Sequence, residues 1–302
     1  MKAQVLLPKV FNFPFTYNSK KEYKIGDLVE VPFGSKKEIG VIWKNSYSEP
    51  QNINIKDINK NTGYSINSNF IDFIEWFSIY NMVPIGLVLK MAIGGSDKFL
   101  KIEDNLIKSK KTPIKNFKLN YEQSEALKFL GKVNNKFDVS VLQGTTGSGK
   151  TLVYFERIKK IIEKNNQALV LLPEIFLTND FKSRFEDFFG FEPAIWHSKI
   201  TPKQKRIVWK GVIRNKIKIL VGARSALLLP FKSLGVIIVD EEHDTSYKQD
   251  DGVIYNARDM AITRASFENI PINLVSSIPS IETYNNIRNK KYRHIKIQKR
   301  FD

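Results

Sequence analysis

The stretch DVSVLQGTTGSGKTLVYF, residues 138–155, constrains the fold of this chain more than any other. It fits the pattern G-x-x-x-x-G-K-[ST], with a β-branched apolar run before it and a helix-compatible run after it. In such a strand–loop–helix unit, backbone N–H groups and the helix N-terminus surround a phosphate. The predicted nucleotide-binding residues of this loop are Gly144, Thr145, Thr146, Gly147, Ser148, Gly149, Lys150 and Thr151.

Two side chains of the loop have specific chemistry. Lys150 can reach the β- and γ-phosphates, and the Thr151 hydroxyl can bind Mg²⁺, so the predicted cofactors are ATP and Mg²⁺. The alternative is a glycine-rich surface turn before a helix, which the third glycine, Gly147, and the flanking runs disfavour. The motif does not indicate what the hydrolysis of the nucleotide drives.

Strand-like and helix-like runs alternate from residue 116 onward, which predicts a parallel sheet covered on both faces. The predicted strands are DVSVLQ, QALVLLP, EPAIWH, IKILVGA, LGVIIVDE and INLVSS. Before them, residues 1 to about 60 contain short strand-like runs separated by turn formers, and a helical run with a break at Pro84 follows. We therefore expect a β-rich domain over residues 1–97, a linker over 98–115 and an α/β lobe over 116–302.

A second acidic motif, DEEH, ends the apolar run LGVIIV. Asp240 at the carboxyl end of a buried strand can hold Mg²⁺ together with Thr151, and Glu241 can orient or deprotonate a water. The predicted catalytic residues are Lys150, Asp240 and Glu241. The alternative is an acidic helix cap on a solvated turn. For His243 two interpretations stay open, a polar surface residue or a relay of the γ-phosphate state to a DNA-binding element.

DExH-type motifs distinguish helicase-like NTPases from P-loop kinases and GTPases. Gln123, in LNYEQSEAL, stands where helicases of superfamily 2 use a glutamine to bind adenine, and Arg224, in VGARSALLLPF, can contact a phosphate chain. Each signal is weak alone, and their order along the chain is what favours a helicase-like lobe.

The formal charge of +17 favours a polyanionic partner. Residues 1–115 carry 17 Lys and Arg against 11 Asp and Glu, a net +6, and the rest carries 31 against 20, a net +11, so the excess is not a basic tail. The alternative is a general Lys- and Asn-rich composition. The chain has no cysteine, which excludes disulfides and cysteine-bound zinc within it, and the three histidines are not at ligand spacing. No apolar run approaches transmembrane length, so we expect a cytoplasmic protein without a membrane partner.

The runs GTTGSGKT, ALVLLPEIFLT, ARSALLLPF, DEEHDTSYKQDDGVIYNARDMA and SSIPSIET, in that order, resemble the PriA family of replication-restart helicases, as does the N-terminal FTY, GDLVEVPFG and IGVIW pattern. The resemblance implies a RecA-like helicase lobe after a small β-rich DNA-binding domain. It implies an ATP-dependent 3′–5′ DNA helicase that acts in replication restart and primosome assembly at stalled forks. The implied partners are forked DNA, 3′ ends and single strands, with single-strand-binding protein and primosome proteins.

The resemblance also assigns roles to residues in both parts of the chain. The N-terminal domain would bind a 3′ DNA end through Phe15, Gly34 and Lys56. An aromatic-rich loop after DEEH would couple DNA contact to ATP hydrolysis through Tyr247, Lys248, Gln249, Tyr255 and Arg258, and aromatic faces and cations suit DNA. The alternatives are core packing for Phe15 and an ordinary surface loop after DEEH.

The chain departs from the family pattern at several places. Thr16 replaces an aspartate, Ile278 replaces a threonine, and the winged-helix segment is reduced to the linker. The chain stops at Asp302, before the second helicase lobe that supplies an arginine finger and a zinc-binding cysteine cluster in the family. Because such an arginine is worth roughly 10³ to 10⁵ in rate, we expect little ATPase activity from these residues alone. The alternatives are a catalytically inactive DNA-binding or regulatory protein and, less favoured by DEEH, a small-molecule kinase or other P-loop NTPase.

Overall fold

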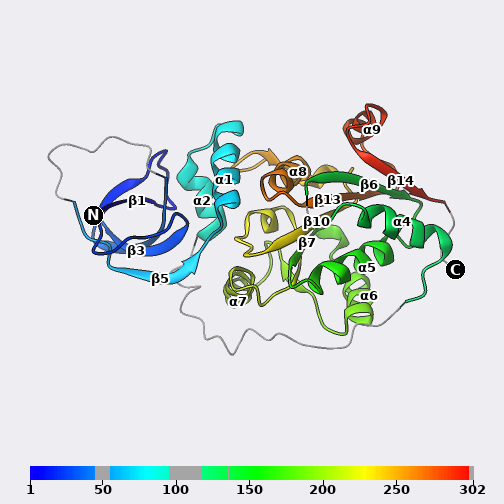
Figure 1. The fold of residues 1–302 in the computed structure, drawn as a ribbon, viewed down its shortest axis with the longest axis horizontal. Coiled ribbons are helices and arrows are strands. Elements are labelled where there is room, and N and C mark those ends of the chain that lie inside the picture. Colours follow the sequence, from blue (N-terminus) through cyan, green and yellow to red (C-terminus); the bar gives the residue numbers. More distant parts are fainter. Residues whose placement is uncertain (45–54, 95–116, 135, 299–302) are drawn as a thin grey trace. The chain divides into compact units, whose positions relative to one another are not determined.

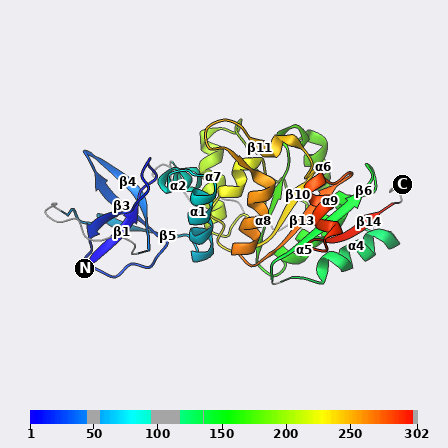
Figure 2. The ribbon, with the colours of Figure 1, turned by 90° about the horizontal axis from the view of Figure 1, so that it is seen from above.

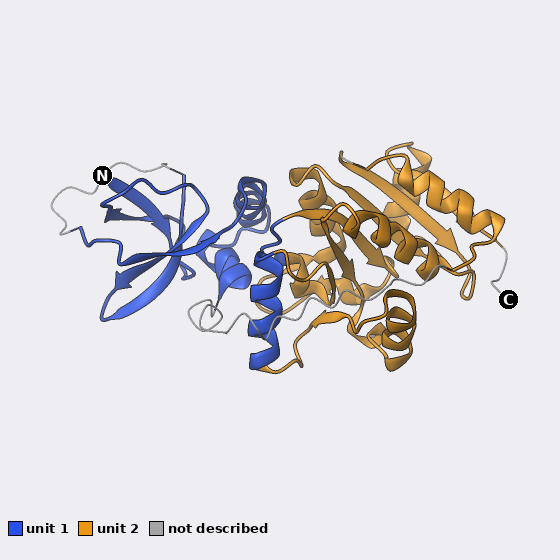
Figure 3. Ribbon diagram, turned by 60° about the horizontal axis from the view of Figure 1, so that its bottom comes forward, with its two compact units in different colours: residues 1–107, 202–214, 228–232 blue, residues 108–201, 215–227, 233–302 orange. Residues whose placement is uncertain are grey.

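The computed structural model describes residues 1–44, 55–94, 117–134 and 136–298 (Figure 1). They separate into two compact units (Figure 3). Unit 1 contains residues 1–107, 202–214 and 228–232, and unit 2 contains residues 108–201, 215–227 and 233–302. The linker expected over residues 98–115 lies outside the described residues.

Unit 1 is built on a five-stranded antiparallel sheet with the order β2-β1-β4-β3-β5. Val29 and Val31 of β3 lie two residues apart and so face the same side of the sheet, where they join Val5 and Tyr17 in a small core. The strands are β1 (Lys2–Leu6), β2 (Phe15–Asn18), β3 (Asp27–Phe33), β4 (Lys36–Ile42) and β5 (Lys60–Ser65).

Among the described residues of unit 1, the sheet is accompanied by the helices α1 (Ser68–Tyr80), α2 (Ile85–Ile93) and α7 (Pro202–Ile213). The Asn67 side chain caps α1 by accepting from Phe70 N, and Pro84 stands at the N-cap of α2, where the sequence predicted a break. Helix α7 is distant in sequence, but the buried Trp209 indole donates to the Ala92 carbonyl at 2.8 Å.

Unit 2 contains a seven-stranded, fully parallel sheet with the order β14-β6-β13-β10-β7-β9-β8. Its strands β6, β10, β13 and β14 are labelled in Figure 2. The strands predicted from alternation are all present, and the α/β fold with its preceding β-rich domain is confirmed. The strands are β6 (Asp138–Gly144), β7 (Gln167–Leu171), β8 (Ala194–Trp196), β9 (Ile219–Gly222), β10 (Leu234–Asp240), β13 (Pro271–Ser276) and β14 (Arg293–Ile297).

Helices cover both faces of this sheet (Figure 1). One face packs on α4 (Tyr121–Gly131), α5 (Lys150–Ile162) and α6 (Asn179–Phe189), where Phe155 and the phenylalanines of α6 form a ring cluster. Helix α8 (Ala257–Phe267) packs on β10 and β13. The remaining elements are η2 (Glu174–Phe176), η3 (Arg224–Leu228), η4 (Thr245–Tyr247), β11 (Lys248–Gln249), β12 (Tyr255–Asn256) and α9 (Ile281–Arg288). Among the described residues, no helix has the length and apolarity that a membrane span needs.

Candidate nucleotide and DNA sites

The phosphate loop joins the end of β6 to the start of α5. Gly147 and Gly149 have φ values of 83° and 79°, a left-handed conformation that favours glycine. A Cβ on Gly144 would lie 2.5 Å from Ser148 Oγ, so this position has no room for a side chain. The sequence therefore places glycine where the turn and the close approach of the loop need it.

Two buried donors lie inside this loop. Lys150 is 8% exposed, and its Nζ donates to the carbonyls of Gly144 at 2.7 Å and Thr145 at 3.2 Å. The buried Ser148 hydroxyl finds no hydrogen-bond partner among the described residues. A buried polar group without a partner is costly, and an ammonium held only by carbonyls is available to an anion. The loop thus fits a phosphate chain.

Asp240 ends β10, which is separated from β6 by β13 alone. Its buried carboxylate accepts from Tyr154 Oη of α5 at 2.9 Å and from Glu241 N at 3.0 Å. Burial and the neighbouring Glu241 raise the pKa of Asp240 to about 6, against the opposing charge of Lys150. The predicted Mg²⁺ ligand and the phosphate loop therefore meet at the carboxyl end of one sheet. Thr151 lies close to Tyr154. Burial raises the pKa of the Tyr154 phenol well above its usual value, and a hydrogen bond with the Thr151 side chain opposes this rise.

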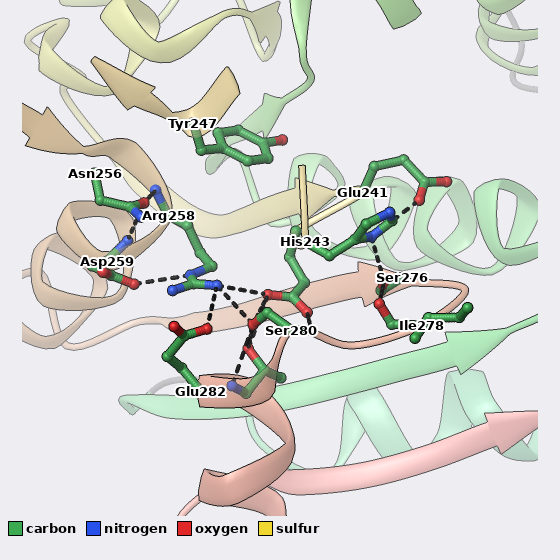
Figure 4. A network of polar contacts seen from close by, with 12 residues as sticks. Glu241, His243, Tyr247, Asn256, Arg258, Asp259, Ser276, Ile278, Ser280 and Glu282 are labelled. Carbon is green, nitrogen blue, oxygen red and sulfur yellow. Dashed lines mark hydrogen bonds and ion pairs between the residues drawn. The ribbon is translucent and has the colours of Figure 1, made fainter. Parts of the chain in front are cut away.

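Glu241, the next residue of DEEH, lies beside His243 (Figure 4). Glu241 has a left-handed φ of 48°, and its carboxylate lies 3.6 Å from His243 Nδ1. The same nitrogen is 2.8 Å from Ser276 Oγ at the end of β13, and that hydroxyl donates to the Ile278 carbonyl at 2.8 Å. The Ile278 side chain is 74% exposed, so the backbone, and not the side chain that replaces a threonine, connects to DEEH.

Glu242 was not predicted as a functional residue, but its buried carboxylate is the centre of a hydrogen-bond network. Its carboxylate accepts from Ser280 N at 2.7 Å, Thr283 Oγ1 at 2.9 Å and Arg258 Nη1 at 3.3 Å. It joins the turn after β10 to the N-terminus of α9 and to α8. In the sequence, Ser280 after Pro279 is recognisable as the N-cap of α9, but nothing there indicates that Glu242 bonds to it.

The predicted coupling residues after DEEH are mostly buried. Tyr247 is 1% exposed, and its hydroxyl donates to the carbonyls of Leu171 and Asp240 at 3.0 and 2.6 Å. Burial raises the pKa of Tyr255 to about 12, and the Arg258 guanidinium is buried beside Glu242 and Asp259. These contacts hold the loop against the sheet, and the DNA-coupling role of the three residues stays a prediction.

Lys248 of the predicted coupling set and Arg224, predicted to contact a phosphate chain, are less buried than Tyr247, Tyr255 and Arg258. The Lys248 side chain is 65% exposed and pairs with Asp250 at 3.3 Å. Arg224, at the start of η3, donates through its guanidinium to the Lys248 carbonyl. This bond joins the Arg224 side chain to the backbone at the start of the β11–β12 ribbon, and contact of Arg224 or Lys248 with DNA stays a prediction.

Gln123 is fully buried behind the phosphate loop. Its Nε2 donates to the Ser148 carbonyl at 3.1 Å, and its Oε1 accepts from Asn120 N at 3.0 Å as part of a capping box that starts α4. The side chain therefore connects this helix start to the loop backbone. The adenine contact assigned to it stays a prediction.

In unit 1 the structure brings the predicted 3′-end residues together. The rings of Phe15 and Phe33 are 5.4 Å apart, Gly34 follows Phe33 with a φ of 59°, and Lys56 Nζ donates to the Gly34 carbonyl at 3.4 Å. A Cβ on Gly34 would meet nothing within 4 Å. Thr16 points away from this group, because its hydroxyl pairs with the Gln4 amide at 3.1 Å.

Comparisons with known proteins agree with this architecture. The family profile described as type III restriction enzyme, res subunit, matches residues 116–291, and the PriA profile described as 3′DNA-binding domain (3′BD) matches residues 4–94. Fold and profiles together define a helicase-type P-loop lobe preceded by a β-rich domain of the 3′-DNA-binding type.

Relatives match across both units. The chain is 40% identical to the replication restart protein PriA of Rickettsia conorii over 99% of this chain and 46% of that protein. It is 35% identical to PriA of Helicobacter pylori over 92% of this chain and 43% of that protein. A crystal structure of the DUF1998 helicase MrfA bound to DNA covers 60% of this chain and 27% of that chain, at 20% identity, with a TM-score of 0.42. The chain belongs to the PriA family, and it spans about half the length of the curated relatives it matches.

Proposed function

We propose that this chain provides the DNA-end-binding domain and the nucleotide-binding lobe of an ATP-dependent 3′–5′ DNA helicase. The observation that carries the proposal is the meeting of Lys150 and Asp240 at the end of one parallel sheet, where nucleotides bind in such folds. The role is replication restart at stalled forks, including primosome assembly, and chromosomal DNA as a partner implies the cytoplasm. The partners are forked DNA, 3′ ends and single strands, with single-strand-binding protein and primosome proteins.

In the nucleotide site, each residue has a separate task. Bound ATP with Mg²⁺ supplies the phosphoryl transfer to water that drives movement along DNA. Lys150 exchanges its two carbonyl acceptors for phosphate oxygens, and the Ser148 hydroxyl gains a partner. Thr151 and Asp240 would hold the Mg²⁺, a site with one carboxylate being common for this ion. Glu241 orients the attacking water, and Gln123 contacts the adenine.

In unit 1, Phe15, Gly34 and Lys56 bind the 3′ terminus of a DNA strand. The Phe15 ring stacks on the terminal base, the open space beside Gly34 admits the sugar, and Lys56 pairs with a phosphate. Thr16 takes no part in this binding, since its hydroxyl is already paired with Gln4.

Signals between nucleotide and DNA pass through the turn after β10. His243 senses the γ-phosphate state through Glu241 and transmits it to Ser276. The β11–β12 ribbon, with Lys248 and the neighbouring Arg224, contacts single-stranded DNA. Tyr247, Tyr255 and Arg258 hold that ribbon on the sheet.

The experiment is phosphate release with and without forked DNA, measured for this chain and for Lys150→Ala, together with binding of a fluorescent ATP analogue. Mg²⁺-dependent nucleotide binding that Lys150→Ala abolishes supports the proposed site. Phosphate release that forked DNA raises above the Lys150→Ala level shows turnover, whereas DNA binding without Mg²⁺-dependent nucleotide binding favours a DNA-binding protein without turnover. Absence of nucleotide binding in the wild-type chain contradicts the proposal.

A further inference from the structure

Four phenylalanine rings gather at one rim of unit 1. Ring centroids are separated by 5.0 Å between Phe11 and Phe15, 5.2 Å between Phe13 and Phe15, and 5.4 Å between Phe15 and Phe33. Phe15 and Phe33 also pack on the core of the sheet, whereas Phe11 and Phe13 extend the cluster from the loop before β2. Phe13 is 43% exposed. Core packing therefore does not account for this ring.

The loop that carries Phe11 and Phe13 is fixed to the start of α2. Gly86 N donates to the Phe11 carbonyl at 3.0 Å, and Ile85 N donates to Asn12 Oδ1 at 3.3 Å. A Cβ on Gly86 would lie 2.1 Å from the Lys9 carbonyl, so the loop approaches the helix as closely as glycine permits. Because the rings are held in place by backbone hydrogen bonds, little ordering is needed when a ligand binds.

The charges around the cluster indicate what kind of ligand fits. Lys56 Nζ lies at Gly34, next to Phe33, and is held only by a carbonyl at 3.4 Å in the described structure. Lys9 borders the loop and pairs with Glu38 at 2.7 Å, and Lys37 lies 3.6 Å from Glu30. The exposed Phe13 ring and its half-buried neighbours, beside lysines, suit a single strand of DNA, whose bases stack and whose phosphates pair with cations.

We propose that Phe11 and Phe13 form a second nucleotide subsite, which stacks the base next to the 3′-terminal one. The proposal rests on the proposed binding of a 3′ DNA end at Phe15. The terminal base packs on Phe15 and Phe33. The strand then continues over Phe13, and the phosphate between the terminal and the second nucleotide lies near Lys56. The domain then requires two unpaired nucleotides at the 3′ end, and a fully paired or singly frayed end binds less tightly.

The test is fluorescence anisotropy with 5′-labelled oligothymidylates that end in a free 3′-hydroxyl. Three oligonucleotides are compared, one intact, one abasic at the terminal position and one abasic at the second position. The proteins are the wild-type chain, Phe15→Leu, Phe13→Leu and Phe13→Tyr. Tyr80→Leu is the matched control, because Tyr80 is also an exposed ring of unit 1, 62% exposed and stacked on Trp76 of the same helix.

We expect Phe13→Leu to weaken binding of the intact oligonucleotide about tenfold, within the range for one stacked base. Phe13→Tyr and Tyr80→Leu should bind like the wild type. The second-position abasic site should weaken binding to the wild type by a similar factor but add nothing in Phe13→Leu, because both changes remove one contact. Thermal melting within a few degrees of the wild type verifies the fold of each variant.

Two results separate the possible failures. If Phe15→Leu and the terminal abasic site weaken binding while Phe13→Leu and the second abasic site do not, the end-binding function stands and the second subsite is wrong. If neither Phe15→Leu nor blocking the 3′-hydroxyl with phosphate changes the affinity, the proposed end binding fails, and the inference fails with it.

Discussion

The phenolic hydroxyl of Tyr154 donates a hydrogen bond to Asp240, with 2.9 Å between Oη and Oδ2. Tyr154 lies on α5, one turn after the phosphate loop, and Asp240 ends β10, so the bond joins the two halves of the nucleotide site. Both side chains are buried. The phenol therefore fixes the carboxylate that we assign to Mg²⁺ and acts as a positioning residue.

Removing that hydroxyl should weaken Mg²⁺-dependent nucleotide binding. In Tyr154→Phe the ring keeps its packing while Asp240 loses a charge-assisted hydrogen bond, which is worth about 1.5–3 kcal/mol. We expect the Mg²⁺ concentration at half-maximal binding of a fluorescent ATP analogue to rise about tenfold. Tyr121→Phe is the control, since Tyr121 is 80% exposed on α4. An unchanged Mg²⁺ midpoint in Tyr154→Phe would show that the bond has no positioning role.

Neutralising Asp240 should stabilise the metal-free fold at neutral pH. Its pKa is raised from 3.8 to about 6, mainly by burial, so the folded state binds the proton more tightly than the unfolded state does. The resulting stability is fully present below pH 3.8 and is lost as the pH rises through about 6. Asp240→Asn should therefore unfold with a free energy up to about 3 kcal/mol higher than the wild type at pH 7.5, with the gain shrinking toward about pH 4.

Urea unfolding without Mg²⁺ at several pH values measures this difference. The same variant should bind nucleotide with little response to Mg²⁺, because the amide no longer attracts the cation. Parallel stability curves for the wild type and Asp240→Asn across the pH range would contradict the burial of a charged carboxylate at this position.

Much of unit 2 was predictable because its strands are nearly continuous apolar runs. Such runs are typical of a parallel sheet that helices cover on both faces. Strand β14 was not predicted, since RHIKI alternates charged and apolar residues and buries mainly Ile297 at the edge of the sheet. Strand β2 was missed because it is short and half-buried. The grouping of α7 with unit 1 depends on contacts such as the Trp209 indole on the Ala92 carbonyl, which no local pattern reveals.

In the site, loop motifs were informative because they encode backbone conformation and charge at fixed spacing. Side-chain direction was not encoded in the same way. The consecutive carboxylates of DEEH point to three different partners, since Asp240 contacts Tyr154, Glu241 with its left-handed φ lies near His243, and Glu242 turns into a buried network. Likewise, the composition of the loop after DEEH suggested DNA-facing aromatics, whereas Tyr247 turns inward to two backbone carbonyls.

Breaking the buried ion pair of the network should destabilise the lobe. Arg258→Met leaves the Glu242 carboxylate buried with only the Ser280 and Thr283 donors, and removing one partner of such a pair typically costs about 3–5 kcal/mol. Lys248→Met is the control, because its ion pair with Asp250 is exposed and should contribute less than about 1 kcal/mol. Urea unfolding at pH 7.5 compares the two. Equal stability of both variants would mean that the guanidinium is not needed for the fold and is available for DNA.

A methyl group on Gly144 should abolish nucleotide binding without unfolding the lobe. The added Cβ would lie 2.5 Å from Ser148 Oγ and 3.1 Å from the Ile297 carbonyl, so the loop must open away from β14. Because Lys150 contacts the carbonyls of Gly144 and Thr145, this opening would also move its ammonium away from the phosphate-binding position. We expect the affinity of Gly144→Ala for a fluorescent ATP analogue to fall at least about tenfold, which corresponds to about 1.4 kcal/mol. Gly131→Ala is the control, since a Cβ there meets nothing within 4 Å and alanine favours the helix. Wild-type affinity in Gly144→Ala, with far-UV circular dichroism unchanged, would show that the nucleotide does not bind in this loop.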